Sequence, residues 1–430
     1  MLRGRRRILR SNVFCFPSGL RVALKRVEKN RPVTIFVCVK TGAVNEPEDK
    51  SGISHFVEHL SFKGTKRRSA KDLSTQLEEV GANANAFTTK TSTCFYATGL
   101  QENIESYFDI LSDIIFDSKY DEADIEKERK VIYEEIDMYD DDPESVCYEE
   151  FVKNFYAGTP LSRSVLGTKE SLKNITRGDI TEYVSSNYVA SNIVVSVVGN
   201  FGFEKIKKLT SKYFEKYLRG QKPQEKNTII SSVIVPDKSV SFVKKDIAQT
   251  QIALGFVCDN IFSKNRMAYT LMCFIFGGGM GSRLFQSVRE DLGLVYNISC
   301  MPEFYETGGD VVITLGTNDK NRSLALSTIK AQIDKVLDEG FCEEELKRAK
   351  TFCKSLISSS HELGSDIARS MAKNIAIFSR DITLEERLEK VDQVTLFDIN
   401  EIAKKTFNYS NMCASCVSKT EDENLFNVFE

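Results

Sequence analysis

The chain has 430 residues, of which 41% are hydrophobic and 28% charged, which suits a folded globular protein with two domains of about 200 residues. Its 58 basic and 61 acidic residues give a net charge of −3, which argues against a broad cationic surface for nucleic acid. No apolar run approaches the ~18 residues that a membrane-spanning helix requires.

The N-terminal segment is basic. Residues 1–10 contain five arginines, and no acidic residue occurs before Glu28. An organellar transit peptide is rich in arginine and poor in acids in this way. The turn signal Pro17-Ser18-Gly19, however, leaves only about a dozen residues for targeting, so a short basic tail is the preferred interpretation.

Two of the three histidines form the pattern H-x-x-E-H, with His55, Glu58 and His59 inside the segment 52–65. On a helix, positions i and i+4 share a face, so both imidazoles can reach one metal ion. Glu58 projects to the same side, close enough to hold a water molecule on that metal. Two imidazoles and a neighbouring carboxylate are what a hydrolytic zinc centre needs. The alternative, a chance glutamate beside two histidines, is disfavoured by the specificity of the motif.

A third zinc ligand is often a carboxylate, and the helical segment 124–139 offers several. Its apolar residues recur at helical spacing and form one buried stripe: Ile125, Ile132, Ile136 and Tyr139. At about 100° per residue, Glu135 and Glu128 fall within roughly 60° of the centre of this stripe. Glu134 and Glu126 fall away from it, toward solvent. Among these carboxylates, helical phase favours Glu135 as a ligand and Glu128 as a supporting carboxylate. An ordinary surface helix with solvated glutamates fits the pattern equally well.

The two halves of the chain resemble each other. A shift of 219 residues aligns Thr176 and Asp179 with Thr395 and Asp398, and both copies indicate a helix, a turn and an apolar strand. A period of this length indicates a domain duplication. We predict a zinc-bearing domain at 1–218, a polar linker at 219–228 and a homologous domain without the zinc motif at 229–430.

Apolar or alternating runs predict strands at 33–39, 87–97, 193–198, 251–257, 310–315 and 412–417. Longer helical segments separate these strands. Such a mixture predicts an α+β fold, in which each domain has a mainly antiparallel sheet packed with helices. The segment 81–89 has small residues entering an alternating strand, which favours plain packing at a sheet edge. The alternative is an edge strand that binds a peptide as a further strand.

Other candidate sites are weaker. The eleven cysteines are irregularly spaced, which favours buried reduced thiols, and Cys413 and Cys416 form a C-x-x-C without a second pair. The triple glycine at 277–279 lacks the G-x-x-x-x-G-K-[ST] pattern and predicts a tight turn, not a phosphate site. His361 has no partner histidine in its half, so a polar surface position is favoured.

The motifs together resemble a known family. Three stretches carry the likeness: GISHFVEHLSFKGT at 52–65, ANANAFT at 82–88 and ERKVIYEEI at 128–136. They resemble the pitrilysin-like (inverzincin) metallopeptidases. The likeness is greatest to the branch that contains the catalytic subunit of the mitochondrial processing peptidase and its single-chain bacterial relatives, and it covers nearly the whole chain. It implies two homologous domains, one zinc ion per chain held by His55, His59 and Glu135, and Glu58 as general base. Glu128 matches the additional acidic residue of the family.

The resemblance also implies substrate-binding residues. It assigns this role to Phe62, which follows the second histidine, and to Asn85 and Ala86 on the predicted edge strand. In the second half, Arg289 and Tyr296 match an arginine and a tyrosine seven residues apart that contact substrate in the family. Whether this pair would act on the zinc of its own chain or on that of a partner subunit stays open.

The expected function is that of a zinc endopeptidase acting on unfolded or extended peptides, in presequence cleavage, precursor maturation or peptide clearance. The alternative is a catalytically silent structural or partner subunit of a larger complex, which the intact zinc set disfavours. We expect a homodimer enclosing a chamber, although a different partner chain would also fit. A cytoplasmic protein of bacterial type is expected, with the mitochondrial matrix or a related organelle as the alternative.

Overall fold

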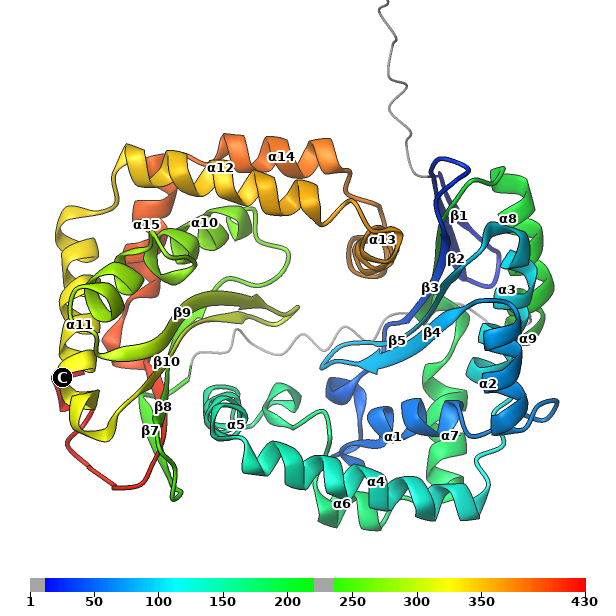
Figure 1. Ribbon diagram of the computed structural model, residues 1–430, viewed down its shortest axis with the longest axis horizontal. Coiled ribbons are helices and arrows are strands. Elements are labelled where there is room, and N and C mark those ends of the chain that lie inside the picture. Colours follow the sequence, from blue (N-terminus) through cyan, green and yellow to red (C-terminus); the bar gives the residue numbers. More distant parts are fainter. Residues whose placement is uncertain (1–11, 220–235) are drawn as a thin grey trace, which may run out of the picture. The chain divides into compact units, whose positions relative to one another are not determined.

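The computed structural model describes residues 12–219 and 236–430, which form two compact units (Figure 1). The basic residues 1–10 and nearly all of the predicted linker at 219–228 lie outside the described residues. Unit 1 comprises the described residues up to 136 together with 163–219 and 358–386. Unit 2 comprises 137–162, 236–357 and 387–430. Each unit is therefore assembled from both halves of the chain.

Unit 1 contains a six-stranded sheet in the order β1-β2-β6-β3-β5-β4. Its strands are β1 (Asn12–Cys15), β2 (Arg21–Arg26), β3 (Val33–Val39), β4 (Asn83–Thr88), β5 (Thr93–Gly99) and β6 (Ile193–Gly199). The pair β2–β6 is parallel and the other pairs are antiparallel. Every residue of β3 is buried, because both faces of the sheet are covered. Strand β4 lies at the edge, as its small residues predicted.

The helices of unit 1 are α1 (Ile53–Ser61), α2 (Ala70–Glu79), α3 (Ile104–Phe116), α4 (Glu122–Asp141), α6 (Lys169–Lys173), α7 (Arg177–Asn187), α8 (Phe203–Thr210), α9 (Lys216–Leu218) and α13 (Gly364–Phe378). The last five residues of α4 belong to unit 2. The main core lies on one face of the sheet, where α1, α3, α4, α7 and α8 contribute apolar side chains.

Helix α13 covers the opposite face of the unit 1 sheet, although it comes from the C-terminal half of the chain (Figure 1). Its Met371, Ala372 and Ile375 are buried against that face. Arg21 donates from Nη1 to the Ile375 carbonyl at 2.9 Å, and Ser196 donates to the Ala368 carbonyl at 2.6 Å. The sheet and the helix are therefore joined by polar as well as apolar contacts.

Unit 2 repeats this plan with a five-stranded sheet in the order β7-β11-β8-β10-β9. Its strands are β7 (Ser239–Lys244), β8 (Thr250–Cys258), β9 (Val295–Phe304), β10 (Gly309–Thr317) and β11 (Cys413–Ser418). Its helices are α5 (Pro143–Phe155), α10 (Arg266–Gly277), α11 (Arg322–Glu339), α12 (Glu343–Ser359), α14 (Leu384–Gln393) and α15 (Leu396–Thr406). Helices α12 and α14 each have one end assigned to unit 1.

Helix α5 plays the part in unit 2 that α13 plays in unit 1 (Figure 1). It comes from the N-terminal half and packs on β8 and β11. A Cβ at Gly255 would lie 2.1 Å from Cε2 of Phe151, so only glycine allows this close approach. Ser415 donates to the Cys147 carbonyl at 2.7 Å. The two units thus exchange one helix each.

The repeat found in the sequence has a structural counterpart. Thr176 and Thr395 cap the N-termini of α7 and α15, and each accepts from the backbone N–H of an aspartate three residues later. The strand that follows, β6 or β11, pairs parallel with one neighbour and antiparallel with the other. The predicted α+β fold with two homologous domains is confirmed.

Two local predictions were wrong. The predicted strand at 87–97 is a hairpin, in which a turn separates β4 from β5. The turn consists of Thr89, Lys90, Thr91 and Ser92. Thr89 bonds the backbone of Ser92, so a run that favours strands by composition reverses direction. Tyr139 was assigned to the buried stripe of α4 but is 44% exposed, whereas Ile125 and Ile132 are buried. The last turn of α4 lies beyond the core of unit 1.

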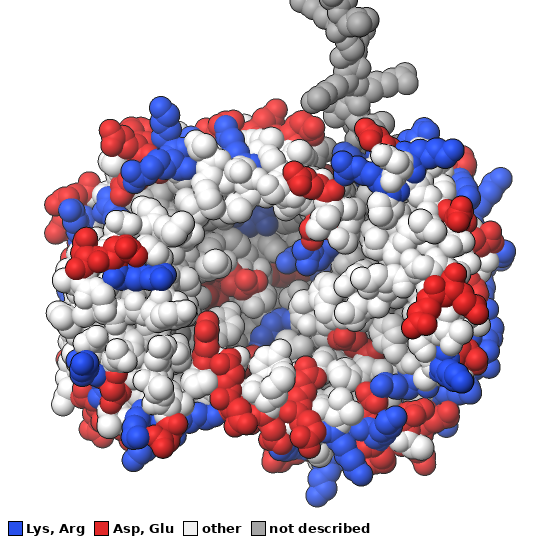
Figure 2. Space-filling view, viewed as in Figure 1, with Lys and Arg blue, Asp and Glu red and all other residues white. Residues whose placement is uncertain are grey.

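The cysteines are free thiols, and all except Cys15 and Cys342 are buried. None of the helices in the described parts of the chain has the length and apolar character needed to cross a membrane. Acidic and basic side chains are intermixed on the face shown in Figure 2, where neither unit presents a broad basic area.

Candidate metal centre

Helix α1 begins at a buried carboxylate. Glu46 accepts hydrogen bonds from the backbone N–H groups of Gly52 at 2.7 Å and Ser54 at 2.8 Å, which lack partners within the helix. Gly52 adopts φ = 91°, a left-handed conformation that favours glycine. Burial raises the pKa of Glu46 to about 7, although the two N–H groups oppose that shift. The start of the helix is therefore fixed just before His55.

One side of α1 is apolar and packs into the core of unit 1. Phe56, Val57 and Leu60 are almost completely buried there. His55, Glu58 and His59 occupy the other side, where the two imidazole rings lie 4.6 Å apart, centroid to centroid. The sequence thus presents both histidines and the glutamate on one face, as the i, i+4 spacing predicted.

Helix α4 brings Glu135 to the two histidines. Its Oε2 lies 3.7 Å from His55 Nε2 and 3.6 Å from His59 Nε2. The three ligand atoms all lie within 4.8 Å of one another, and no other such group occurs in residues 12–219 and 236–430. Zn²⁺ with bonds of about 2.0–2.1 Å in tetrahedral geometry needs ligand atoms about 3.4 Å apart. The two carboxylate–imidazole distances of 3.6 and 3.7 Å are close to that spacing, so the three side chains fit a zinc ion.

The two histidines have different surroundings. Burial, together with the neighbouring His59, lowers the pKa of His55 to about 3, so the imidazole of His55 is neutral, as a metal ligand requires. His55 Nδ1 is buried and has no hydrogen-bond partner among the described residues. His59 Nδ1, in contrast, lies 3.3 Å from Oε2 of Glu128. Only His59 therefore has its ring oriented by a carboxylate.

Glu58 lies beside the three ligand atoms and is tied to the edge strand. Thr88, the last residue of β4, donates its hydroxyl to Glu58 Oε2 at 2.5 Å. Burial raises the pKa of Glu58 above the ordinary value for a glutamate, and the Thr88 hydrogen bond acts against that rise. With Oε2 held by Thr88, Oε1 is the oxygen free to contact a water molecule.

The other predicted carboxylates divide as helical phase indicated. Glu128 is only 2% exposed, and its Oε1 lies 2.8 Å from Lys63 Nζ. Glu134 is exposed on the opposite side of α4. Glu126 is paired on the surface with Arg129, at 3.0 Å.

The predicted substrate residues lie in both units. Phe62 follows α1 directly and packs against the core of unit 1. Asn85 is exposed on β4 and Ala86 is buried. Because β4 is the last strand of the sheet, its outer edge pairs with no other strand among the described residues. Arg289 and Tyr296 belong to unit 2, where the guanidinium carbon lies 6.0 Å from the tyrosine ring centroid. Tyr296 is 72% exposed.

Three residues around the centre were not predicted. Glu46 caps α1, Thr88 holds Glu58, and Lys63 pairs with Glu128. Lys63 follows His59 by four residues but lies beyond the end of α1 at Ser61, so helical spacing would not have indicated it. Nothing in the sequence near Thr88 or Glu46 indicates their partners, because both contacts depend on the tertiary structure.

Comparison with known proteins identifies the family. The profile described as Insulinase (Peptidase family M16) matches residues 21–169, and that described as Peptidase M16 inactive domain matches residues 174–352. An uncharacterized zinc protease of Rickettsia felis is 34% identical over 401 residues, which cover 92% of this chain and 95% of the relative. An uncharacterized zinc protease of Bacillus subtilis is 32% identical over 391 residues, which cover 91% of this chain and 94% of the relative.

Solved structures share the fold. That of a protease from Helicobacter pylori superposes with a TM-score of 0.87 at 23% identity, covering 95% of this chain and 99% of the other. A putative M16-like peptidase from Alicyclobacillus acidocaldarius gives a TM-score of 0.83 at 21% identity, covering 95% of this chain and 98% of the other. The sequence relatives, together with the motifs on α1 and α4, support a zinc-dependent peptidase function, and the chain belongs to peptidase family M16.

Proposed function

We propose that this protein is a zinc endopeptidase that cleaves unfolded or extended peptides, with one zinc ion per chain. The observation that carries the proposal is the convergence of His55, His59 and Glu135, whose ligand atoms lie within 4.8 Å of one another, with Glu58 beside them. Two imidazoles, one carboxylate and an open position are the ligand set of a catalytic zinc. When bound there, zinc supplies Lewis acidity toward the scissile carbonyl and acidifies water.

In this mechanism Glu58 moves the proton. It accepts a proton from the attacking water and later gives it to the leaving amine. The hydroxyl of Thr88 holds one carboxylate oxygen at 2.5 Å, which keeps the other oriented for this transfer. A carboxylate surrounded by protein and raised in pKa is better suited to both steps than one in water, since it must accept and release the same proton.

Substrate binding is assigned to the edge of the unit 1 sheet. Strand β4 pairs with β5 on one side only, so its other side can bind an extended peptide as a further strand. Asn85 and Ala86 lie in the middle of β4, and Thr88 at its end contacts Glu58. A peptide paired with β4 would therefore run toward the proposed general base. Phe62, Arg289 and Tyr296 are further proposed contacts.

We assign the physiological role to processing of presequences or precursors or to clearance of peptides, carried out by a homodimer in a bacterial-type cytoplasm. A catalytically silent subunit is disfavoured because all four residues of the zinc set are present. The family's inactive-domain profile matches residues 174–352, which contain no H-x-x-E-H.

The test uses the purified full chain. Zinc per chain and cleavage of a quenched, unstructured peptide are measured on the same preparation of the wild type, Glu58→Gln and Glu134→Gln. We expect Glu58→Gln to keep its zinc and lose at least about 100-fold in kcat, since general-base catalysis contributes roughly 10²–10⁴-fold. Glu134→Gln, the exposed control, should match the wild type. Near-normal cleavage by Glu58→Gln would remove Glu58 as the base, and absence of zinc and of activity in the wild type would favour the silent subunit.

A further inference from the structure

An ion pair between a partly exposed lysine and a buried glutamate lies next to the metal-ligating group. Glu128 is 2% exposed, and its two carboxylate oxygens face different partners. Oε1 lies 2.8 Å from Lys63 Nζ, and Oε2 lies 3.3 Å from His59 Nδ1. Oε1 has no aligned hydrogen-bond donor, so the contact with Lys63 is an ion pair rather than a hydrogen bond. Lysine, glutamate and histidine therefore form a chain that ends at a proposed zinc ligand.

Lys63 is the cation of this centre. Three carboxylates, those of Glu58, Glu128 and Glu135, lie around the two histidines. Within the described chain, Lys63 is the one Lys or Arg side chain that pairs with any of them. A buried carboxylate without a compensating charge is costly, so the position of Glu128 depends on this lysine.

We propose that Lys63 is a positioning residue of the metal centre, which holds Glu128 against His59 and thereby keeps His59 Nε2 directed at the zinc site. The proposal rests on the zinc centre proposed above. With Oε1 held by the ammonium group, Oε2 faces Nδ1 of the imidazole and accepts a hydrogen bond from its N–H. Nδ1 then carries the hydrogen, and the lone pair of Nε2 points toward Glu135, 3.6 Å away.

The contrast between the two histidines shows why His59 needs this support. His55 is nearly buried and is confined by its packing, whereas the side chain of His59 is 22% exposed. His55 Nδ1 has no polar partner among the described residues. Glu128 therefore provides the orienting contact for the more exposed ligand, and Lys63 orients Glu128.

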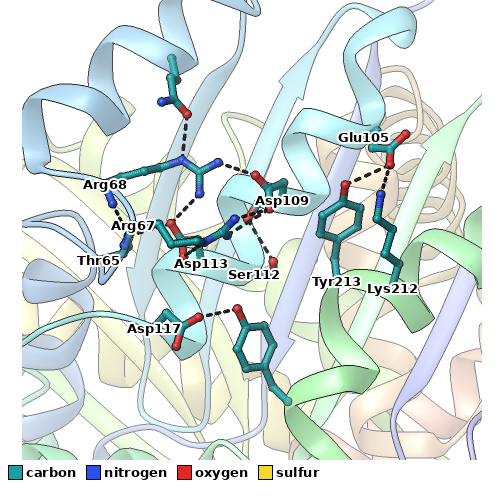
Figure 3. Close-up of polar contacts among 12 residues, drawn as sticks. Thr65, Arg67, Arg68, Glu105, Asp109, Ser112, Asp113, Asp117, Lys212 and Tyr213 are labelled. Carbon is teal, nitrogen blue, oxygen red and sulfur yellow. Dashed lines mark hydrogen bonds and ion pairs between the residues drawn. The ribbon is translucent and has the colours of Figure 1, made fainter.

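The segment that carries Lys63 is itself fixed to helix α3. Arg67 and Arg68 converge on Asp109 and Asp113 (Figure 3). Asp113 is fully buried, and it accepts from Arg68 Nη1 at 2.6 Å and from Arg67 Nε at 2.9 Å. It also accepts from the hydroxyl of Thr65 at 2.7 Å.

Backbone bonds add to this anchoring. Lys63 N–H donates to the Leu60 carbonyl at 3.1 Å, and Lys119 N–H donates to the Gly64 carbonyl at 3.1 Å. The backbone of Lys63 is thereby held between the end of α1 and the start of the segment that leads to α4. A flexible lysine in an unanchored loop would lose more entropy in forming the ion pair.

The first experiment measures zinc affinity by chelator competition, with no proteolysis involved. Lys63→Met removes the charge and keeps most of the side-chain volume, so we expect zinc binding roughly 10- to 100-fold weaker than in the wild type, the usual cost of losing an orienting contact. Lys63→Arg, which retains the charge, should restore affinity to within a few-fold. Lys66→Met is the matched control, because Lys66 lies three residues away and pairs with Asp117 at 72% exposure. It should leave zinc affinity unchanged.

The second experiment asks whether Lys63 acts through Glu128. In a Glu128→Gln background, Lys63→Met should weaken zinc binding less than twofold, because the contact that it orients is already lost. Circular dichroism and thermal unfolding of the zinc-free variants identify any that fail to fold. If Lys63→Met does not fold, the zinc affinity of Lys63→Arg is compared with that of the wild type in its place.

The outcomes separate this proposal from the proposed function. If the wild type binds zinc and Lys63→Met binds it within twofold of the wild type, the positioning role is wrong and the zinc centre stands. An equal loss in both backgrounds would also overturn it, since Lys63 would then act without Glu128. If the wild type binds no zinc at all, both proposals fail.

Discussion

Thr88 donates its hydroxyl proton to Oε2 of Glu58 at 2.5 Å, and this bond joins the end of the edge strand β4 to the proposed general base on α1. Strand and helix are separated by about one helix and a loop in the sequence, yet one hydroxyl couples the proposed peptide-binding edge to the proton-transfer group. A substrate paired with β4 would therefore contact a strand that is already bonded to the catalytic carboxylate.

The first prediction concerns this bond. Thr88→Val keeps the shape of the side chain and removes the hydroxyl, so we expect kcat to fall roughly tenfold while KM and zinc affinity stay near normal. Thr88→Ser should retain most of the activity. Thr75→Val, on the exposed side of α2, serves as the control. Steady-state kinetics on a quenched peptide measure the effect, and unchanged kcat for Thr88→Val would show that the hydroxyl does not position Glu58.

The second prediction separates two adjacent glutamates of α4. Glu135 lies 3.6–3.7 Å from both histidines, whereas Glu134 is exposed on the other side of the helix. Glu135→Gln should therefore weaken zinc binding by at least about 100-fold, because the neutral amide is a poor zinc ligand. Glu134→Gln should bind zinc as the wild type does. Chelator competition decides between them, and equal affinities of the two variants would mean that the ligand has been misassigned.

Sequence reasoning predicted which of these side chains share a helix face, because that depends on helical spacing. His55 and His59 share a face at i, i+4, and the phase of the isoleucines distinguishes Glu135 from Glu134. The support given by Thr88 and Glu46 depends on which strand and loop pack against α1, and no local pattern encodes that. Composition likewise failed at residues 89–92, where threonines form a turn instead of continuing a strand.

The exchange of helices between the units was also beyond sequence analysis. Both α5 and α13 have ordinary amphipathic compositions, and neither indicates that it packs on the sheet of the other half. The predicted linker at 219–228 divides the chain into two continuous domains. Each compact unit, in contrast, also includes a segment from the other side of this linker.

The third prediction follows from this exchange. Cleavage at a protease site introduced within residues 220–235 should leave the two halves associated, because α13 buries Met371 and Ile375 on the unit 1 sheet and α5 buries Phe151 and Phe155 in unit 2. Burying a side chain of this size contributes about 1.5–3 kcal/mol. Gel filtration of the nicked protein measures the association. Separation of the halves without denaturant would contradict the account of the fold.

The fourth prediction concerns pH and unit 2. Asp310 is fully buried, accepts from the Tyr156 hydroxyl at 2.5 Å, and has its pKa raised by burial to about 7. The folded state binds a proton at Asp310 more tightly than the unfolded state does. The contribution of this protonation to the free energy of unfolding is therefore fully present below the ordinary aspartate pKa. It decreases as pH rises toward 7, by up to roughly 1.4 kcal/mol per pH unit.

Asp310→Asn removes the titrating group, so the variant should become more stable relative to the wild type as pH rises from about 4 to 7. The urea midpoint of unfolding at several pH values measures this difference. Asp338→Asn, at an exposed position of α11, is the control and should run parallel to the wild type. A difference between Asp310→Asn and the wild type that stays constant with pH would show that folding does not raise the pKa of Asp310.

The fifth prediction concerns substrate size and assembly. We expect a homodimer. A folded domain cannot offer an extended strand to Asn85 and Ala86 on β4, so the enzyme should cleave unstructured peptides of tens of residues and spare compact proteins. Light scattering and digestion of a peptide mixture beside a stable folded domain test both parts. A fully active monomer, or rapid loss of the folded domain, would contradict this expectation.

The central claim is that His55, His59 and Glu135 hold one zinc ion per chain. Anomalous diffraction at the zinc absorption edge from crystals of the zinc-loaded protein tests it most directly. The account predicts one strong peak per chain, bounded by the two Nε2 atoms and Glu135 Oε2, and its loss in Glu135→Gln crystals grown at the same zinc concentration. A peak at any other position, or no peak near His55 and His59, would contradict the account.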